Sequence, residues 1–136
     1  MYRKSEIIFF LLPVVADAIF IFVPREKVSE IVETKGAIPF DVTGAELGHH
    51  GNKCSFEAIV EKYNLADPAI KKLAEIVNGA DVSPETYNCP ESSGLKAIAE
   101  GFALLGLKDD HEILEKEFAV YDALYEYCRK AFLKSP

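Results

Sequence analysis

The stretch IFIFVPREKVSEIVETKGAIPFDV, residues 19–42, carries the clearest pattern of alternating element types in the chain. It begins with a β-branched and aromatic run, Ile19–Val23, which ends at a proline and predicts a buried strand. Residues 25–35 then place Val28, Ile31 and Val32 on one face of a predicted helix. The glycine that follows this segment is the residue type preferred just after a helix end.

A second strand is predicted over Ala37–Val42. Because Pro39 lacks a backbone N–H, we expect this strand at a sheet edge or with a bulge. Strand, helix and strand in this order match a compact, right-handed βαβ unit with parallel strands. The run Ile7–Leu12 offers one further strand.

The remainder of the chain predicts helices by apolar period and by capping residues. Their starts are expected at Ser55, at Asp67-Pro68, at Pro90 and at Asp109 or Asp110. In the segment after Pro90 we expect Leu95, Ile98, Ala99, Phe102 and Leu105 to face inward. The predicted fold is therefore α+β, a helix-dominated single domain with a small N-terminal βαβ-type sheet.

Composition limits the classes of partner. The 136 residues are 49% hydrophobic and 27% charged, and the formal net charge is -7. An acidic balance argues against a nucleic-acid groove, which needs basic side chains. It also makes long-range capture of a free anion unfavourable. Cationic ligands, protein partners and self-association into a homo-oligomer stay open.

The N-terminus and the cysteines bear on the compartment. Three widely spaced cysteines without a CxxC pair predict neither a disulfide framework nor a zinc knuckle, and favour a cytoplasmic protein. Export is the alternative, because basic residues before the apolar run Ile7–Val23 resemble a signal peptide, with Ala16-Asp17-Ala18 like a cleavage site. Pro13 and Asp17 interrupt this run, so we expect no stable membrane span.

The glycine-punctuated loop from Thr43 to Cys54 gathers residue types that bind metals. It holds Glu46, His49 and His50 besides the Cys54 thiol. Imidazole, carboxylate and thiolate together suit a divalent transition metal of the zinc type. The alternative is that the histidines are ordinary polar loop residues and that Cys54 is a small buried side chain. Adjacent residues of an extended segment point apart, so we expect only one of the two histidines to face a site.

Two residues outside the loop are further candidates. Asp81 follows a predicted helix end and His111 lies in the first turn of the last helix. Asp81 is either a carboxylate ligand or a plain turn residue. His111 is either a distant ligand or acid–base group that closes on the loop, or part of a solvated first turn. The chain has no GxSxG, P-loop or GxGxxG motif, so the sequence names no reaction.

A series of short motifs resembles the chromate-resistance domain found at the C-terminal end of ChrB-type proteins. The resemblance covers about residues 19–132. The motifs are Phe22-Val23-Pro24, Pro39-Phe40-Asp41-Val42, Glu46-Leu47-Gly48-His49-His50-Gly51, Cys54-Ser55-Phe56-Glu57, Leu73-Ala74-Glu75-Ile76-Val77, Gly94-Leu95, Asp109-Asp110-His111-Glu112 and Tyr121-Asp122-Ala123-Leu124-Tyr125.

The resemblance implies a role in prokaryotic chromate resistance and raises the weight of the candidate ligands, which fall inside its motifs. Before the first matching strand, family members carry an Asp-Arg pair, a cysteine and a Trp-Leu-Ile motif. In this sequence, residues 1–18 instead form an atypical apolar segment. The chromate-resistance-like domain is therefore expected over residues 19–136. The regulatory half that precedes this domain in ChrB-type proteins is not among these residues, so direct transcriptional control lacks support. Asn78 stands where relatives often have histidine.

These observations give one leading hypothesis and one rival. The leading hypothesis is a metal-binding protein of the metal and oxyanion stress response, with a small oxyanion as a further ligand. Its candidate metal ligands are Glu46, His49, His50, Cys54, Asp81 and His111. The rival is a non-catalytic sensor or interaction module without metal, which predicts an exposed surface around Tyr127.

Overall fold

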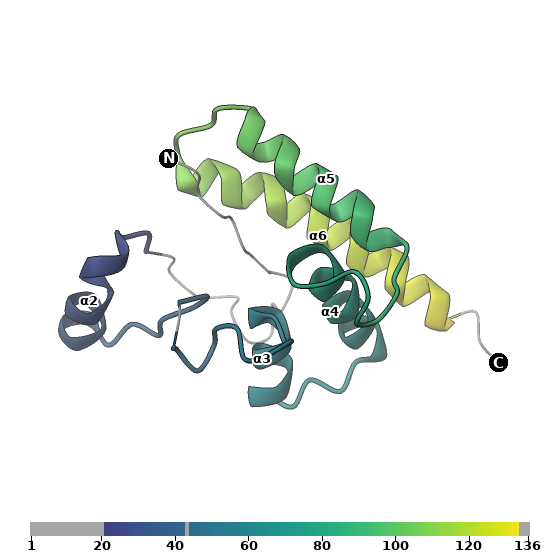
Figure 1. Ribbon diagram of the computed structural model, residues 1–136, viewed down its shortest axis with the longest axis horizontal. Helices are drawn as coiled ribbons and strands as arrows, with labels where there is room; N and C mark the ends of the chain where they lie inside the picture. The colour runs from purple at the N-terminus through teal and green to yellow at the C-terminus, as the bar shows by residue number, and fades with distance from the viewer. Residues whose placement is uncertain (1–20, 43, 134–136) are drawn as a thin grey trace.

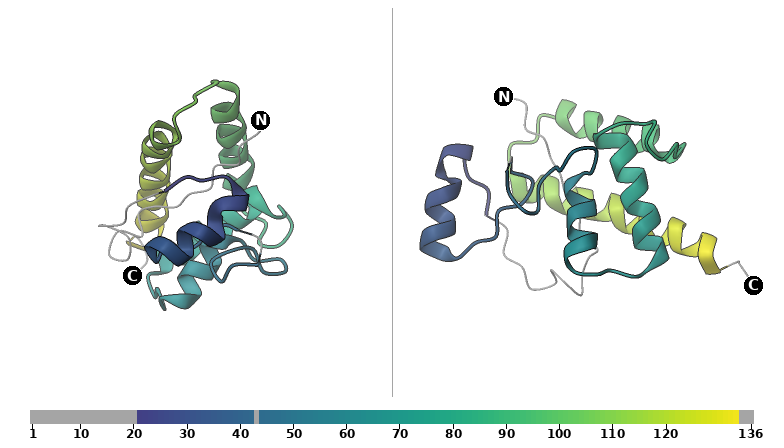
Figure 2. Two further views of the ribbon diagram at one scale, coloured as in Figure 1. Left: turned by 90° about the vertical axis from the view of Figure 1, so that its left-hand side faces the viewer. Right: turned by 60° about the horizontal axis from the view of Figure 1, so that its bottom comes forward.

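The computed structural model describes residues 21–42 and 44–133, and this part of the chain is helical. The helices are, in chain order, the short 3-10 helix η1 Arg25–Lys27 and the α-helices α2 Val28–Lys35, α3 Ser55–Lys62, α4 Pro68–Asp81, α5 Glu91–Leu104 and α6 Asp110–Leu133. In Figure 1, α5 and α6 run in opposite directions; α4 packs against both of them, and α3 packs against α4. Helix α2 packs against η1 and lies apart from this body, as the right-hand view of Figure 2 also shows.

The local signals that predicted the helices are confirmed at their ends. Helix α4 begins at a proline, and the preceding Asp67 accepts a hydrogen bond from the backbone N–H of Ala69 at 2.8 Å. Helix α2 is followed by Gly36, which has a left-handed backbone (φ 64°). Asp109 precedes α6 and accepts from the backbone N–H of His111. These caps satisfy backbone groups that have no partner inside a helix.

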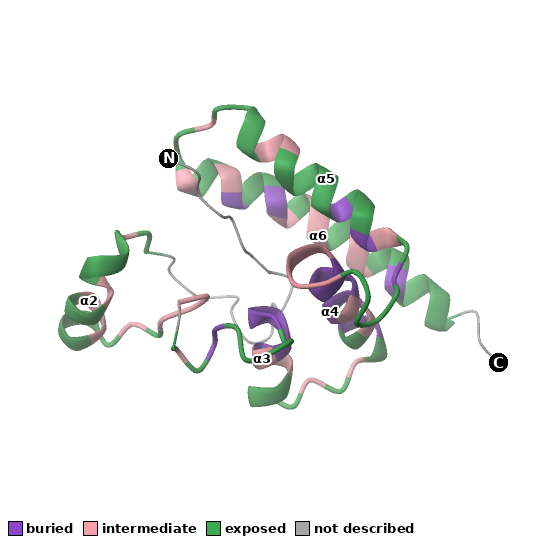
Figure 3. Cartoon of the chain, viewed as in Figure 1, coloured by how far each residue is buried: buried purple, intermediate pink, exposed green. Residues whose placement is uncertain are grey.

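Helix α4 is the centre of the packing, and it contacts α3, α5 and α6. Its apolar stripe is buried, with Leu73 and Ile76 fully so. Figure 3 shows this core, in purple, along α4 and on the faces that α3 and α6 turn toward it. At the start of α4, the hydroxyl of Tyr125 from α6 donates to Asp67 at 2.6 Å. The capping residue thus also fixes α6 against α4.

Close packing of α4 and α5 depends on Gly79. A Cβ atom at this position would lie 2.2 Å from Ser92 Oγ, inside any possible contact distance. Ser92 is buried and its hydroxyl donates to the Ile76 carbonyl at 2.7 Å, which holds it in place. The missing side chain therefore lets the two helices approach.

The expected α+β class, with its N-terminal βαβ-type sheet, is wrong for the described residues, which contain isolated bridges but no strand. Ile21 and Phe22 are exposed and lack regular structure. In the second expected strand, only Phe40 pairs, in a parallel bridge with Leu47. The proline before Phe40 removes a donor and Asp41 has a left-handed backbone (φ 56°), so a ladder cannot extend past this bridge. Residues 19 and 20 and the run Ile7–Leu12 lie outside the described residues.

One expected apolar face is also wrong in part. Leu95 is buried as predicted, whereas Ile98 is 46% exposed and Leu105 is 64% exposed. The period correctly placed Leu95 and Ile98 on a helix, whereas Leu105 follows the end of α5. Helix α5 buries residues of its first half, Ser92 and Leu95. In the part of the chain that the structure describes, no helix is long and apolar enough to cross a membrane.

Candidate functional site

The predicted loop folds back beside the Phe40–Leu47 bridge. The backbone N–H of Asp41 donates to the Leu47 carbonyl at 2.9 Å, and the Gly48 N–H donates to the Ala45 carbonyl at 3.1 Å. Gly48 lies so close to Val42 that a Cβ atom would be 2.5 Å from the Val42 carbonyl oxygen. This compact turn positions the residue after Gly48, which is His49.

His49 is the residue at which the candidate site converges. Its Nε2 atom lies 3.0 Å from Asp81 Oδ2 and 3.2 Å from Asp41 Oδ1. Asp81 is the last residue of α4, while Asp41 precedes the turn. We call these three residues the His49 cluster. Two carboxylates from segments 40 residues apart therefore approach one imidazole nitrogen that is partly open to solvent.

Asp41 is held in the cluster by its backbone and by a neighbour. Its left-handed conformation (φ 56°) is uncommon for a residue with a side chain, although aspartate adopts it more readily than most. The Ser55 hydroxyl, in the first turn of α3, donates to Asp41 Oδ1 at 2.5 Å. The same oxygen that faces His49 is thus fixed by a hydrogen bond from a buried residue.

A second, buried polar network lies where the loop, α3 and α4 meet. Glu57 accepts hydrogen bonds from the backbone N–H of Cys54 at 3.0 Å, from the side-chain amide of Asn78 and from the hydroxyl of Tyr87 at 2.7 Å. The Asn78 amide also donates to the Asn52 carbonyl at 2.7 Å. Asn78 is fully buried and lies one helical turn before the last residue of α4. This network fixes the end of the loop against the helix that carries Asp81.

Two pKa shifts follow from this arrangement. Burial raises the pKa of the Cys54 thiol to about 12, so the side chain stays neutral at ordinary pH. The hydrogen bond to Glu57 is the main cause that raises the pKa of Tyr87 to about 12. A thiol of this kind is a poor metal ligand, because binding requires the thiolate.

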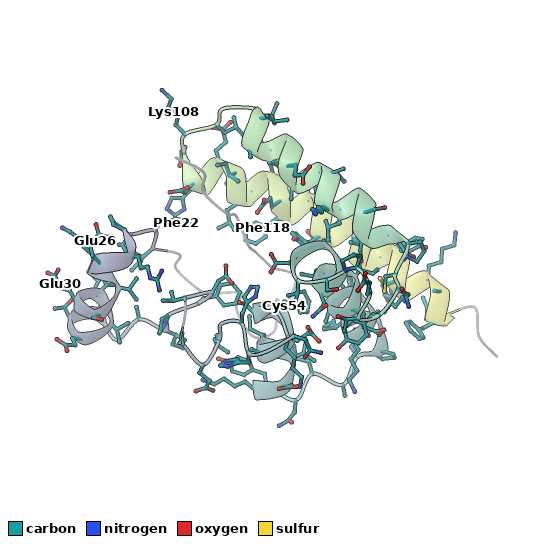
Figure 4. The ribbon with its side chains drawn as sticks, viewed as in Figure 1. Phe22, Glu26, Glu30, Cys54, Lys108 and Phe118 are labelled. Carbon is teal, nitrogen blue, oxygen red and sulfur yellow. The ribbon has the colours of Figure 1, made fainter. Side chains whose placement is uncertain are left out.

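Of the six predicted ligands, the structure brings the side chains of His49 and Asp81 into contact. His50 Nε2 lies 2.8 Å from the Glu46 carbonyl oxygen, and the Glu46 carboxylate pairs with Lys62 at 3.1 Å. Figure 4 labels Cys54, which caps α3 with its buried side chain.

His111 takes part in a different contact. Its ring packs edge-on against Phe22, with centroids 5.0 Å apart, near the start of α6 (Figure 4). Among residues 21–42 and 44–133, no three His, Cys, Asp or Glu side chains form a group that could hold a metal ion as they are placed. The single site expected to join the loop to His111 is therefore not assembled in this form.

Sequence reasoning missed several residues that the fold brings to the site. They are Asp41, Ser55, Glu57 and Tyr87. Glu57 had a local signal, since it stands three residues after a helix cap, where a carboxylate returns a hydrogen bond to the cap. Tyr87 had none, because its contact spans 30 residues of chain.

Comparison with known proteins gives two matches. The chain matches the family described as ChrB, C-terminal domain, over residues 13–128. It is also similar to the protein named Protein ChrB from Cupriavidus metallidurans, at 30% identity over 92 residues. That alignment covers 67% of this chain and 28% of the relative, so the chain spans well under half of the relative's length. No solved structure matches the chain.

Proposed function

Since the chain belongs to the family of ChrB C-terminal domains, we propose that it acts in the cellular response to chromate or related metal stress. We also propose that it binds a divalent transition-metal ion at the His49 cluster. The observation that supports this proposal is the approach of two carboxylates to His49 Nε2, at 3.0 and 3.2 Å. Imidazole nitrogen and carboxylate oxygen are ligands that zinc-like ions accept.

The charge of the cluster favours a cation over chromate itself. The two carboxylates carry two negative charges, whereas the imidazole carries at most one positive charge. A chromate dianion would meet these carboxylates on a protein whose net charge is -7. A cation is attracted by both, so direct chromate binding at this place is unfavourable without a metal.

The side chains as placed contact one another and are not a ready-made metal site. A metal would have to come between the His49 ring and the two carboxylates and replace their direct contacts. Ser55 would keep Asp41 oriented through its hydrogen bond. The chain's own contribution is thus to hold two carboxylates beside one exposed ring nitrogen.

Metal content measured on protein purified without chelator and then incubated with Zn²⁺ tests the proposal. We expect one zinc ion per chain in the unaltered protein, and substoichiometric zinc in His49→Gln and Asp81→Asn. His50→Gln is the matched control, because the adjacent ring bonds to the Glu46 backbone carbonyl of the loop. Absence of zinc from the unaltered protein, or equal loss in His50→Gln, would contradict the metal centre.

An interaction module without metal is the second candidate function. The observation that favours it is the exposure of apolar side chains on α5 and α6, where Tyr127 is 55% and Leu104 is 87% exposed. Such a surface is typical of contact with another protein chain, including a second copy. This function predicts concentration-dependent self-association that zinc does not alter and that Leu104→Lys abolishes in sedimentation experiments. A monomer at all concentrations would exclude the homo-oligomer.

A further inference from the structure

Helix α5 carries an exposed apolar face. The helix packs on α4, and the residues that it buries, Ser92 and Leu95, lie in its first half. Figure 3 shows its later turns in green and pink, the colours of exposed and half-buried residues. Among them, Ile98 is 46% exposed and Leu104 is 87% exposed. Large apolar side chains of this helix therefore stand in solvent.

The sequence spacing turns this face into a continuous stripe. Gly94, Ala97, Gly101 and Leu104 follow one another at intervals of three, four and three residues. This is the a/d spacing of helices that pair with another helix. Ile98 lies beside the stripe and widens it. We call these five residues the α5 stripe, and none of them is charged.

The shape of the α5 stripe is complementary to a copy of itself. A Cβ atom added at Gly94 or at Gly101 would meet no neighbouring atom within 4 Å, so both positions offer open space. Leu104, ten residues after Gly94, instead projects from the surface. A second α5 helix that runs in the opposite direction would place its projecting leucine over this open glycine, and the reverse contact follows by symmetry.

Two charges next to the α5 stripe have the same self-complementary order. Lys96 and Glu100 are exposed and lie one helical turn apart on one side of α5. In an antiparallel pair centred at Ala99, the lysine of each copy lies about 3 Å along the axis from the glutamate of the other. A parallel pair in register would instead bring like charges together. The charge order therefore favours a second copy, in the antiparallel direction, as the partner.

We propose that two copies of the chain pair through antiparallel α5 helices about a two-fold axis level with Ala99. Leu104 of each copy then packs over Gly94 of the other, and Ala97 packs opposite Gly101. The small side chains let the two helices approach closely. This inference rests on the second candidate function, the interaction module, and names its partner. It does not involve the His49 cluster.

The size of the contact indicates a reversible dimer. Helix α5 has 14 residues, so it is about 21 Å long. One helix pair of this length buries less than the roughly 800 Å² per partner that is typical of a stable interface. The net charge of -7 on each copy also opposes association. We therefore expect a dimer that dissociates on dilution.

Sedimentation velocity over a concentration series tests the proposal with two charge variants. Lys96→Glu leaves two carboxylates beside the stripe and Glu100→Lys leaves two ammonium groups, so each variant alone brings like charges together. We expect each to dimerise about tenfold more weakly than the unaltered chain, because symmetry applies every exposed charge pair twice. An equimolar mixture of the two variants should associate again, since opposite charges then meet at both positions.

Lys116→Glu is the matched control for net charge. Lys116 is exposed on α6, away from the stripe, so the same change of charge should leave the dimer unaltered. Circular dichroism checks that each variant is folded. A dimer that persists equally in both charge variants, without gain on mixing, would overturn pairing through α5 and leave the interaction module in place. An unaltered chain that stays monomeric at all concentrations would exclude a second copy as the partner.

Discussion

At the scale of single residues, Glu57 joins three parts of the chain. Its buried carboxylate accepts hydrogen bonds from the end of the loop, from α4 and from the segment before α5. A buried carboxylate is tolerated only when such donors replace its lost hydration. Glu57 therefore stabilises the relative position of the two segments that supply Asp41 and Asp81.

Replacing this carboxylate tests that role. Glu57→Met leaves the Asn78 amide and the Cys54 N–H with fewer acceptors, and we expect it to lower the free energy of unfolding by about 2–4 kcal/mol. Glu57→Gln retains a similar shape and an acceptor oxygen, so its effect should be about 1 kcal/mol. Urea unfolding measures both. Glu61→Met is the control, since Glu61 pairs with Lys53 on the surface and its loss should cost no more than about 0.5 kcal/mol.

Ionisation of the Cys54 thiol lowers the free energy of unfolding at alkaline pH. Its pKa rises from the ordinary value of 9.0 to about 12 on folding, chiefly through burial. Because the folded-state pKa is the higher one, this contribution to stability is fully present below pH 9 and is lost as the pH rises toward 12. We expect the free energy of unfolding to fall by about 2 kcal/mol between pH 9 and 11 from this group.

Cys54→Ser separates this effect from other titrations. The serine hydroxyl does not ionise in this range and is a favoured helix cap, so α3 should still form. In this variant the alkaline loss of stability should be smaller by the Cys54 contribution, and what remains comes from Cys128 and Tyr87, whose pKa values are raised to about 11 and about 12. Urea unfolding under reducing conditions at pH 8, 9.5 and 11 gives both profiles. Superimposable profiles would show that Cys54 does not control the alkaline limit.

At the scale of elements, the contact between α4 and α5 depends on Gly79. We expect Gly79→Ala to destabilise the protein by about 1–3 kcal/mol, because its methyl group would overlap the fixed Ser92 side chain. Gly94 in α5 has open space at the same position, so Gly94→Ala should stabilise by about 0.5–1 kcal/mol through helix propensity alone. Opposite signs in thermal unfolding support the close contact, whereas two stabilising changes would contradict it.

Local chemistry explains which elements the sequence predicts and which it does not. Capping pairs such as Asp67-Pro68 and glycine ends such as Gly36 act within a few residues, so the helix boundaries follow from them. A strand instead needs a partner, and the β-branched and aromatic pattern of residues 19–42 carries no information on pairing. The exposed Ile98 shows the same limit, since an apolar stripe does not reveal which helix covers it.

The candidate site is predictable to a similar extent. The type of residue and the glycines of the loop indicate His49 as a candidate ligand, and the position of Asp81 near a helix end indicates its carboxylate as another. The structure places the two side chains in contact. Their contact spans 32 residues, and the second carboxylate, from Asp41, depends on an unusual backbone conformation. Such contacts arise from the packing of α4 against the loop, which no local spacing encodes.

At the scale of the whole molecule, the net charge of -7 and the two carboxylates of the His49 cluster act in the same direction. Both favour a cation and oppose a free oxyanion. For this protein of the ChrB C-terminal domain family, we therefore propose that the ion bound at the His49 cluster is a cation and not chromate itself. A bound metal would supply the positive centre that the protein otherwise lacks.

Isothermal titration calorimetry with Zn²⁺ and, separately, with chromate tests this central claim most directly. We predict that Zn²⁺ binds with one ion per chain, that Asp81→Asn weakens this binding at least about tenfold, and that His50→Gln does not. Chromate should give no binding heat to the metal-free protein. Chromate binding without zinc, or zinc binding that is unchanged in Asp81→Asn, would contradict the account.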